Sequence, residues 1–133
     1  GNWKGCGTAW RLAEDGHEVT LVTPDPLVGK ELQRMAADAP LRRALARLGV
    51  RFVTESAIIR WDGGTAKIRS LLDGSEQEVE ADALVFAATS MAADSLSVEL
   101  EARGIVFTAI GDCTAARQAA YAIHDGRKVA LGL

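Results

Sequence analysis

The sequence predicts an α/β fold, a three-layer arrangement around a parallel β-sheet with an antiparallel β-meander inserted. Near the start, a helical apolar period is followed by a β-rich run at residues 17–23. Residues 56–80 then change to short alternating runs that are broken by Asp-Gly turn signals. Residues 81–89, ADALVFAAT, are continuously apolar, as expected for a strand that is covered on both faces of a parallel sheet.

The first half of the chain alternates helix and strand. Apolar positions spaced i, i+3, i+4 and i+7 predict a helix from Cys6 to Asp15, which ends at Gly16. A strand follows at residues 17–23, and prolines end it. Residues 29–37 are weakly helical, and residues 39–48 carry one leucine-rich stripe that predicts a helix. Another strand begins at Val50.

After the meander, the pattern returns to buried strands and helices. We expect a strand at 81–89, a helical stretch at 91–104 and a last buried strand at 104–113. An alanine-rich helix runs from Thr114 to about His124, and its extension past Gly126 carries the cost of a glycine within a helix.

Composition narrows the classes of partner. The 133 residues are 48% hydrophobic and 25% charged, as in an ordinary globular domain, and the net charge is -3. A negative net charge does not favour binding to nucleic acid or to an anionic membrane. No apolar run approaches the roughly 20 residues that a bilayer span needs. Cys6 and Cys113 belong to no CxxC pair, so we expect two reduced thiols and no zinc site. A soluble, cytoplasmic protein is expected.

The opening stretch, GNWKGCGTAW, is interpreted as the glycine-rich turn and helix of a dinucleotide-binding unit whose first strand is absent. The fingerprint G-x-G-x-x-G starts at Gly5 and finds Gly7, but Trp10 stands in place of the third glycine. The next strand ends in Thr23 rather than in an acidic residue that could hold ribose hydroxyls, although Asp25 lies just beyond. These departures favour an empty structural relic over a working nicotinamide site.

Two stretches carry a resemblance to a known family. GHEVTLV at 16–22, and Gly111-Asp112-Cys113 followed by Arg117 and AIHDG at 122–126, resemble the carboxy-terminal part of NADH:flavin oxidoreductases of the trimethylamine dehydrogenase and 2,4-dienoyl-CoA reductase type. The resemblance covers nearly the whole chain and implies a Rossmann-like fold of the FAD/NAD(P)-binding type. It also implies an NAD(P)-binding-like inner domain at 1–104 and the returning strand and helix of a flavin/ADP-binding-type domain at 105–133.

The function that the resemblance implies is a nucleotide-binding-like portion of a flavin-dependent NAD(P)H oxidoreductase or amine dehydrogenase. FAD or ADP, and NAD(P)H, are the cofactors it implies for this region, whereas FMN and a 4Fe-4S cluster belong to a barrel that this sequence lacks. The expected partners are an adenine dinucleotide, the rest of the parent oxidoreductase and a second copy paired through open strand edges, without nucleic acid or membrane. The alternative is a non-catalytic dinucleotide-binding or structural interaction module.

The candidate binding residues come from the sequence pattern and from the family resemblance. No catalytic or metal-ligating residues are expected. In the family the glycine-aspartate pair lies beside the ribose or pyrophosphate of the ligand, and Asp112 inherits that role by resemblance. Two positions depart from the family pattern. Ala116 stands before Arg117 where the family usually has proline, and Ser90 stands after Thr89 where the family usually has glycine. The full set of cofactor-binding candidates is Gly5, Gly7, Thr23, Thr89, Gly111, Asp112 and Arg117.

The missing first strand leads to one further expectation. In a sheet of this type the first strand is central, and its loss leaves unpaired interior edges. Residues Ile105 to Ile110, IVFTAI, are apolar and β-branched enough for a central position. We therefore expect this segment, or else another chain, to fill the gap.

Overall fold

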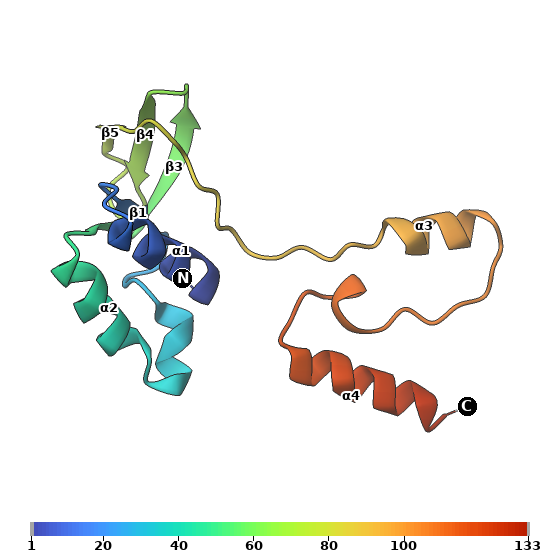
Figure 1. The fold of residues 1–133 in the computed structure, drawn as a ribbon. Coiled ribbons are helices and arrows are strands. Elements are labelled where there is room, and N and C mark those ends of the chain that lie inside the picture. Colours follow the sequence, from blue (N-terminus) through green and yellow to red (C-terminus); the bar gives the residue numbers. More distant parts are fainter. Residues whose placement is uncertain (1, 133) are drawn as a thin grey trace. The chain divides into compact units, whose positions relative to one another are not determined.

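The computed structural model describes residues 2–132, and the chain divides into two compact units, Gly1–Ala87 and Ala88–Leu133 (Figure 1). The domain boundary expected from the sequence lies later, between residues 104 and 105. That boundary separates two sheets of the expected fold, whereas the observed division reflects where contacts along the chain become sparse. It therefore stays a prediction.

The first unit begins with helix α1 (Trp3–Glu14), which starts three residues earlier than expected. The side chain of Asn2 accepts hydrogen bonds from the backbone N–H groups of Lys4, at 3.0 Å, and Gly5, at 3.5 Å. Because this cap satisfies N–H groups of the first turn, the chain is already helical at Gly5 and Gly7. The predicted glycine-rich turn is therefore wrong, and both glycines lie inside the helix.

A short parallel sheet follows. Strand β1 (Thr20–Val22) pairs with β2 (Arg51–Val53), and Leu21 lies opposite Phe52. Between them run a 3₁₀ helix, η1 (Lys30–Met35), and helix α2 (Asp38–Arg47), close to the bounds that the sequence predicted.

One hydrophobic core holds these elements together. Leu21 and Phe52 pack against it from the sheet. Burial raises the pKa of the Cys6 thiol in this core, and both cysteines are free, as expected. The buried residues of this hydrophobic core are Cys6, Ala9, Val28, Leu32, Leu41, Leu45 and Val50.

The antiparallel meander is confirmed. Strands β3 (Ser56–Trp61), β4 (Thr65–Ser70) and β5 (Glu76–Glu80) form a sheet in that order (Figure 1). Both Asp-Gly stretches lie in the turns between them. The fold is thus α/β with one parallel and one antiparallel sheet, while the three-layer arrangement stays a prediction.

Two predicted strands are wrong. Residues 83–94 have no regular structure, and the side chain of Phe86 is 85% exposed. Residues 105–110 are also irregular, and Val106 is 99% exposed. A strand requires a neighbour to complete its backbone hydrogen bonds, and within residues 2–132 neither segment finds one. The expectation that Ile105–Ile110 fills the gap beside β1 within this chain is therefore wrong.

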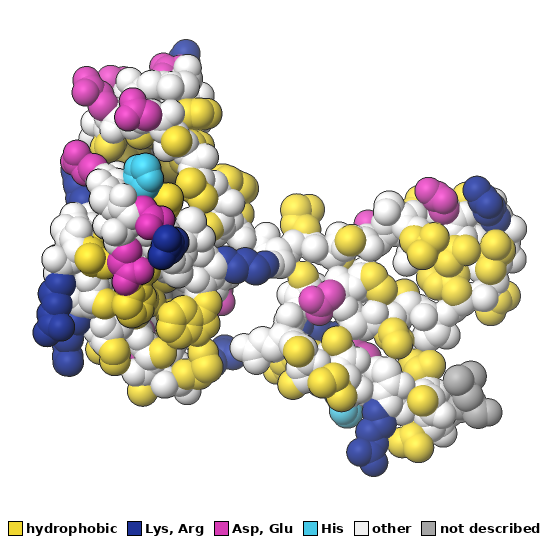
Figure 2. Space-filling view, viewed as in Figure 1, with side chains coloured by type: hydrophobic (Ala, Val, Ile, Leu, Met, Phe, Trp, Pro, Cys, Tyr) yellow, Lys and Arg dark blue, Asp and Glu magenta, His cyan; other side chains and the backbone are white. Residues whose placement is uncertain are grey.

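The second unit contains helix α3 (Ser95–Ala102), a 3₁₀ turn η2 (Gly111–Cys113) and helix α4 (Ala119–Ala130). Helix α4 starts later than the predicted Thr114, because the backbone at Gln118 is extended, with a φ of -83° and a ψ of 152°. As the sequence allowed, α4 continues through Gly126. Hydrophobic side chains stay exposed over this unit (Figure 2), including Leu96, Val98, Ile123 and Leu131.

Within residues 2–132, no helix combines the length and the apolar character that crossing a membrane requires.

Candidate functional site

A tight turn at Gly111 positions the candidate residues of the second unit. Gly111 is buried and has a φ of +70°, a left-handed conformation that favours glycine. A Cβ atom at this position would lie 3.2 Å from the Cβ of Ala122 in α4. Glycine is therefore needed for η2 to pack against α4, and this packing brings Asp112 beside the start of that helix.

Arg117 lies at the centre of a group of polar side chains that we call the Arg117 cluster, made of Asp112, Arg117, Tyr121 and Asp125. The Arg117 Nη2 atom lies 2.6 Å from Asp125 Oδ2, and its guanidinium carbon lies 5.2 Å from the centre of the Tyr121 ring. The Asp112 carboxylate accepts a 3.4 Å hydrogen bond from the Arg117 backbone N–H. The structure thus brings together three of the predicted residues, Gly111, Asp112 and Arg117.

The Arg117 cluster combines the N–H donors of a guanidinium with the acceptor oxygens of two carboxylates. A guanidinium presents a fork of N–H donors that suits phosphate oxygens, and carboxylates accept hydrogen bonds from hydroxyl groups such as those of ribose. Only Nη2 of Arg117 is engaged by a side chain of the described residues. Nε and Nη1 have no side-chain partner among the described residues, and Nη2, which belongs to both donor pairs of the guanidinium, is shared with Asp125.

The neighbouring Cys113 has a structural contact. Its thiol donates to the backbone carbonyl of Ile110 at 3.0 Å. Among residues 2–132, no group of His, Cys, Asp and Glu side chains could hold a metal ion.

At the carboxyl end of β1, the predicted Thr23 is only 4% exposed. Its backbone N–H donates to the Val53 carbonyl at 2.9 Å, and its hydroxyl accepts from the Asp25 N–H at 3.3 Å. Lys30 Nζ lies 3.3 Å from Asp25 Oδ1. The polar groups of Thr23 thus join the ends of two strands, and Asp25 is paired within the unit.

The remaining candidates are not brought together with these. Gly5 and Gly7 lie in α1, where a Cβ at Gly5 would meet that of Ala87 at 3.3 Å and one at Gly7 would meet nothing within 4 Å. Thr89 is exposed in the irregular segment after β5. Because a Cβ at Gly5 would lie so close to that of Ala87, the absence of a side chain at Gly5 allows residue 87 to approach α1.

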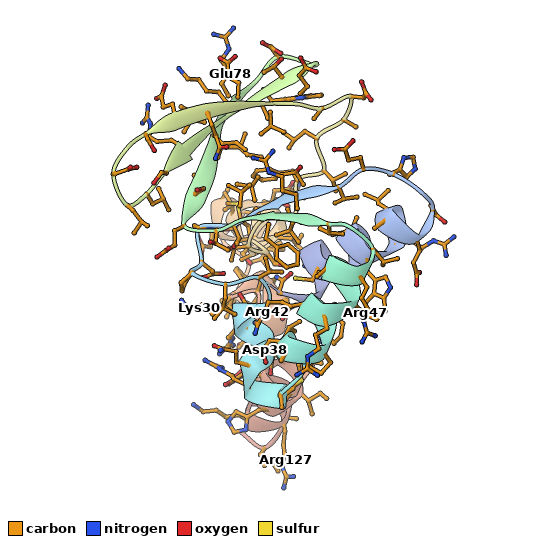
Figure 3. The ribbon with its side chains drawn as sticks, turned by 90° about the vertical axis from the view of Figure 1, so that its left-hand side faces the viewer. Lys30, Asp38, Arg42, Arg47, Glu78 and Arg127 are labelled. Atoms are coloured by element: carbon orange, nitrogen blue, oxygen red, sulfur yellow. The ribbon has the colours of Figure 1, made fainter. Side chains whose placement is uncertain are left out.

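The cationic side chains of α2 include one with a structural role. Arg42 Nη1 lies 2.9 Å from Asp38 Oδ2 and also donates to the Val28 carbonyl at 3.3 Å. Figure 3 shows Arg42 and Asp38 beside each other, with Arg47 at the far end of the helix. Arg42 thus ties α2 to the segment before η1.

Sequence reasoning did not assign Tyr121 or Asp125 to the site. Their spacing of four residues places them on one face of a helix, and Arg117 stands four residues before Tyr121. This spacing is a signal in the sequence that Arg117, Tyr121 and Asp125 could meet. Helical geometry alone does not predict the contact of Arg117 with Asp125, because Arg117 lies before α4 begins.

Comparison with known proteins identifies the family. The family described as pyridine nucleotide-disulphide oxidoreductase matches residues 1–127, and the chain belongs to this family. A comparison with curated protein sequences gives no match.

Solved structures agree with this assignment. The 6-hydroxypseudooxynicotine amine oxidase of Pseudomonas geniculata N1 is 31% identical with a TM-score of 0.85, over 96% of this chain and 20% of its own. A 2-naphthoyl-CoA reductase is 27% identical with a TM-score of 0.77, over 96% of this chain and 19% of its own. Histamine dehydrogenase from Rhizobium sp. 4-9 is 24% identical with a TM-score of 0.90, over 99% of this chain and 22% of its own, and shares the fold.

The family and these structures confirm the resemblance to the trimethylamine dehydrogenase and NADH:flavin oxidoreductase type that the sequence carries. This chain spans about a fifth of the length of each of them.

Proposed function

We propose that this chain is the nucleotide-binding-like portion of a flavin-dependent oxidoreductase, and that the Arg117 cluster contacts the adenine nucleotide half of FAD, or ADP. Redox chemistry would take place at an FMN and iron–sulfur barrel of the parent enzyme, with an NAD(P)H-linked substrate or an amine. The named activity of the 6-hydroxypseudooxynicotine amine oxidase, the neighbour with 31% identity, favours the amine.

The observation that carries this proposal is the convergence of Asp112 and Asp125 on Arg117, which lies just before α4. When bound, the flavin would supply electron transfer. The residues of this chain would bind and orient it, with Arg117 on a phosphate oxygen and the carboxylate of Asp112 on a ribose hydroxyl.

The first unit does not fit a nicotinamide dinucleotide in the usual manner. A bound pyrophosphate requires a glycine turn whose backbone approaches it closely, whereas Gly5 and Gly7 are helical. The Thr23 hydroxyl is buried and engaged by Asp25. These observations support a scaffold role for this unit.

A non-catalytic structural module is the second candidate. The departure at Trp10 favours it, since the indole replaces the small residue that close helix–strand packing needs, and its N–H donates to Glu14 at 2.8 Å. Binding measurements separate the two candidates.

Isothermal titration calorimetry with ADP, FAD, NADH and NADPH tests the proposal. We expect ADP or FAD to bind, and NADH and NADPH to gain nothing from their nicotinamide halves. Arg117→Gln should weaken ADP binding by roughly ten- to a hundredfold, because hydrogen bonds to a charged group contribute roughly 1.5–3 kcal/mol. Arg127→Gln is the matched control, since Arg127 is an exposed cation in the last turn of the same helix (Figure 3).

Absence of heat with ADP and FAD at millimolar concentration would remove the nucleotide proposal, because a Kd of 1 mM still corresponds to about -4 kcal/mol. Equal losses in the Arg117→Gln and Arg127→Gln variants would show a non-specific electrostatic effect.

A further inference from the structure

The carboxylate of Asp125 weakens the attraction of the Arg117 guanidinium for an anion. The guanidinium of Arg117 is paired with Asp125, whose Oδ2 lies 2.6 Å from Nη2, and the Asp112 carboxylate accepts a hydrogen bond from the Arg117 backbone N–H. The side chains of Arg117 and Asp125 are 39% and 27% exposed, so this ion pair is only partly screened by water. A phosphate that approaches Arg117 therefore meets a guanidinium whose charge is already balanced.

The ion pair also sets the direction of the guanidinium. Arg117 lies over the Tyr121 ring at 5.2 Å, where cation–π attraction holds the side chain. Asp125 stands one helical turn after Tyr121, and it takes the Nη2 edge of the same group. Both donor pairs of a guanidinium include Nη2, so a phosphate that binds two N–H groups of Arg117 must share this nitrogen with Asp125.

We propose that Asp125 restrains Arg117. It balances the charge of the guanidinium while no ligand is bound, and a phosphate group of the nucleotide must compete with the Asp125 carboxylate for Arg117. Asp125 thus sets how much more tightly the site binds a nucleotide than the nucleoside that lacks its phosphates. This inference rests on the proposed function, because it concerns the same site.

The test compares ADP with adenosine, using the full chain and calorimetry. Asp125→Asn removes the competing charge but keeps a side chain of similar size. We expect it to bind ADP roughly two- to fivefold more tightly, the range that corresponds to a partly exposed ion pair, with a steeper loss of affinity as salt is added. Adenosine carries no phosphate, so its affinity should not change.

Three control variants separate this role from a general effect of charge. Glu101→Gln removes the same charge from the exposed end of α3, in the same unit, and should leave ADP affinity unchanged. Asp125→Glu should restore wild-type affinity and salt dependence. In an Arg117→Gln background, Asp125→Asn should have no effect, because the group that it restrains is gone.

The two proposals fail in different ways. If wild-type and Asp125→Asn proteins both bind no ADP, the nucleotide function itself is wrong, and this inference with it. If the wild type binds ADP and Asp125→Asn binds it equally or more weakly, only the restraining role of Asp125 is overturned. A gain for adenosine equal to that for ADP would also overturn it.

Discussion

Gly111 has a left-handed backbone conformation and a close neighbour, both of which disfavour a residue with a side chain. Its φ is +70°, and Ala122 lies 3.2 Å from the position that a Cβ would take. Gly111→Ala should destabilise the packing of η2 on α4 by about 1–2 kcal/mol, the cost of a left-handed conformation for a residue with a side chain. Faster amide hydrogen exchange in α4 would report this loss.

Gly126→Ala provides the matched control. Gly126 lies within α4, and a Cβ there would have only Ile110 Cδ1 nearby, at 3.9 Å. Alanine at this position should stabilise the helix by about 0.5–1 kcal/mol. Equal effects of the two substitutions would contradict the role of Gly111.

At the scale of the element, α1 contains two glycines that the sequence suggests belong to a turn. A methyl group added at Gly7 would have no neighbouring atom within 4 Å, so Gly7→Ala should raise the free energy of unfolding by up to about 1 kcal/mol. Gly5→Ala should gain less, because Ala87 lies 3.3 Å away. Denaturant unfolding measures both, and a loss of several kcal/mol at Gly7 would indicate a turn instead of a helix.

The meander should lose stability in acid. Hydrogen bonds from Ser75 lower the pKa of Asp73 to about 2, and the Lys67 and Arg69 side chains lower that of Glu76. Backbone N–H groups of Thr65 and Gly64 lower that of Asp62. Since these pKa values are lower in the folded state, the stabilisation is present above the ordinary values of 3.8 and 4.5 and is lost as pH falls through the folded values.

Amide exchange in β4 and β5, followed from pH 6 downward, measures this loss, which we expect to begin below about pH 4. Asp73→Asn keeps an oxygen acceptor but cannot titrate. This variant should therefore lack the portion of the stability loss that occurs nearest pH 2. Unchanged protection factors in β4 and β5 between pH 6 and pH 2, that is, unchanged exchange relative to an unfolded chain at the same pH, would contradict the prediction.

At the scale of the whole molecule, the two units differ in how much apolar surface they bury. The buried hydrophobic residues of the described chain all lie in the first unit, whereas Gly111 is the buried residue of residues 88–132. Because stability follows buried apolar area, amides of α2 and β2 should exchange more slowly than those of α3 and α4, with opening free energies that differ by several kcal/mol. Equal protection in α2 and α4 would contradict this.

Much of the first unit could be predicted from local pattern. The leucine stripe of α2 and the Asp-Gly turns of the meander are signals that neighbouring residues carry by themselves. The candidate site was predicted less well. Gly111, Asp112 and Arg117 do meet, but Tyr121 and Asp125 were not assigned to the site, since their contact with Arg117 depends on the path of the chain before α4.

The sequence by itself determined the helices α1 and α2, the meander and the family, because period, turn residues and short motifs are local properties. Only the tertiary structure decided the states of residues 81–89 and 105–110, whose apolar, β-branched composition suits strands. A strand exists only where a neighbour accepts its backbone hydrogen bonds, and such a neighbour is a property of the assembled sheet that no local stretch can specify.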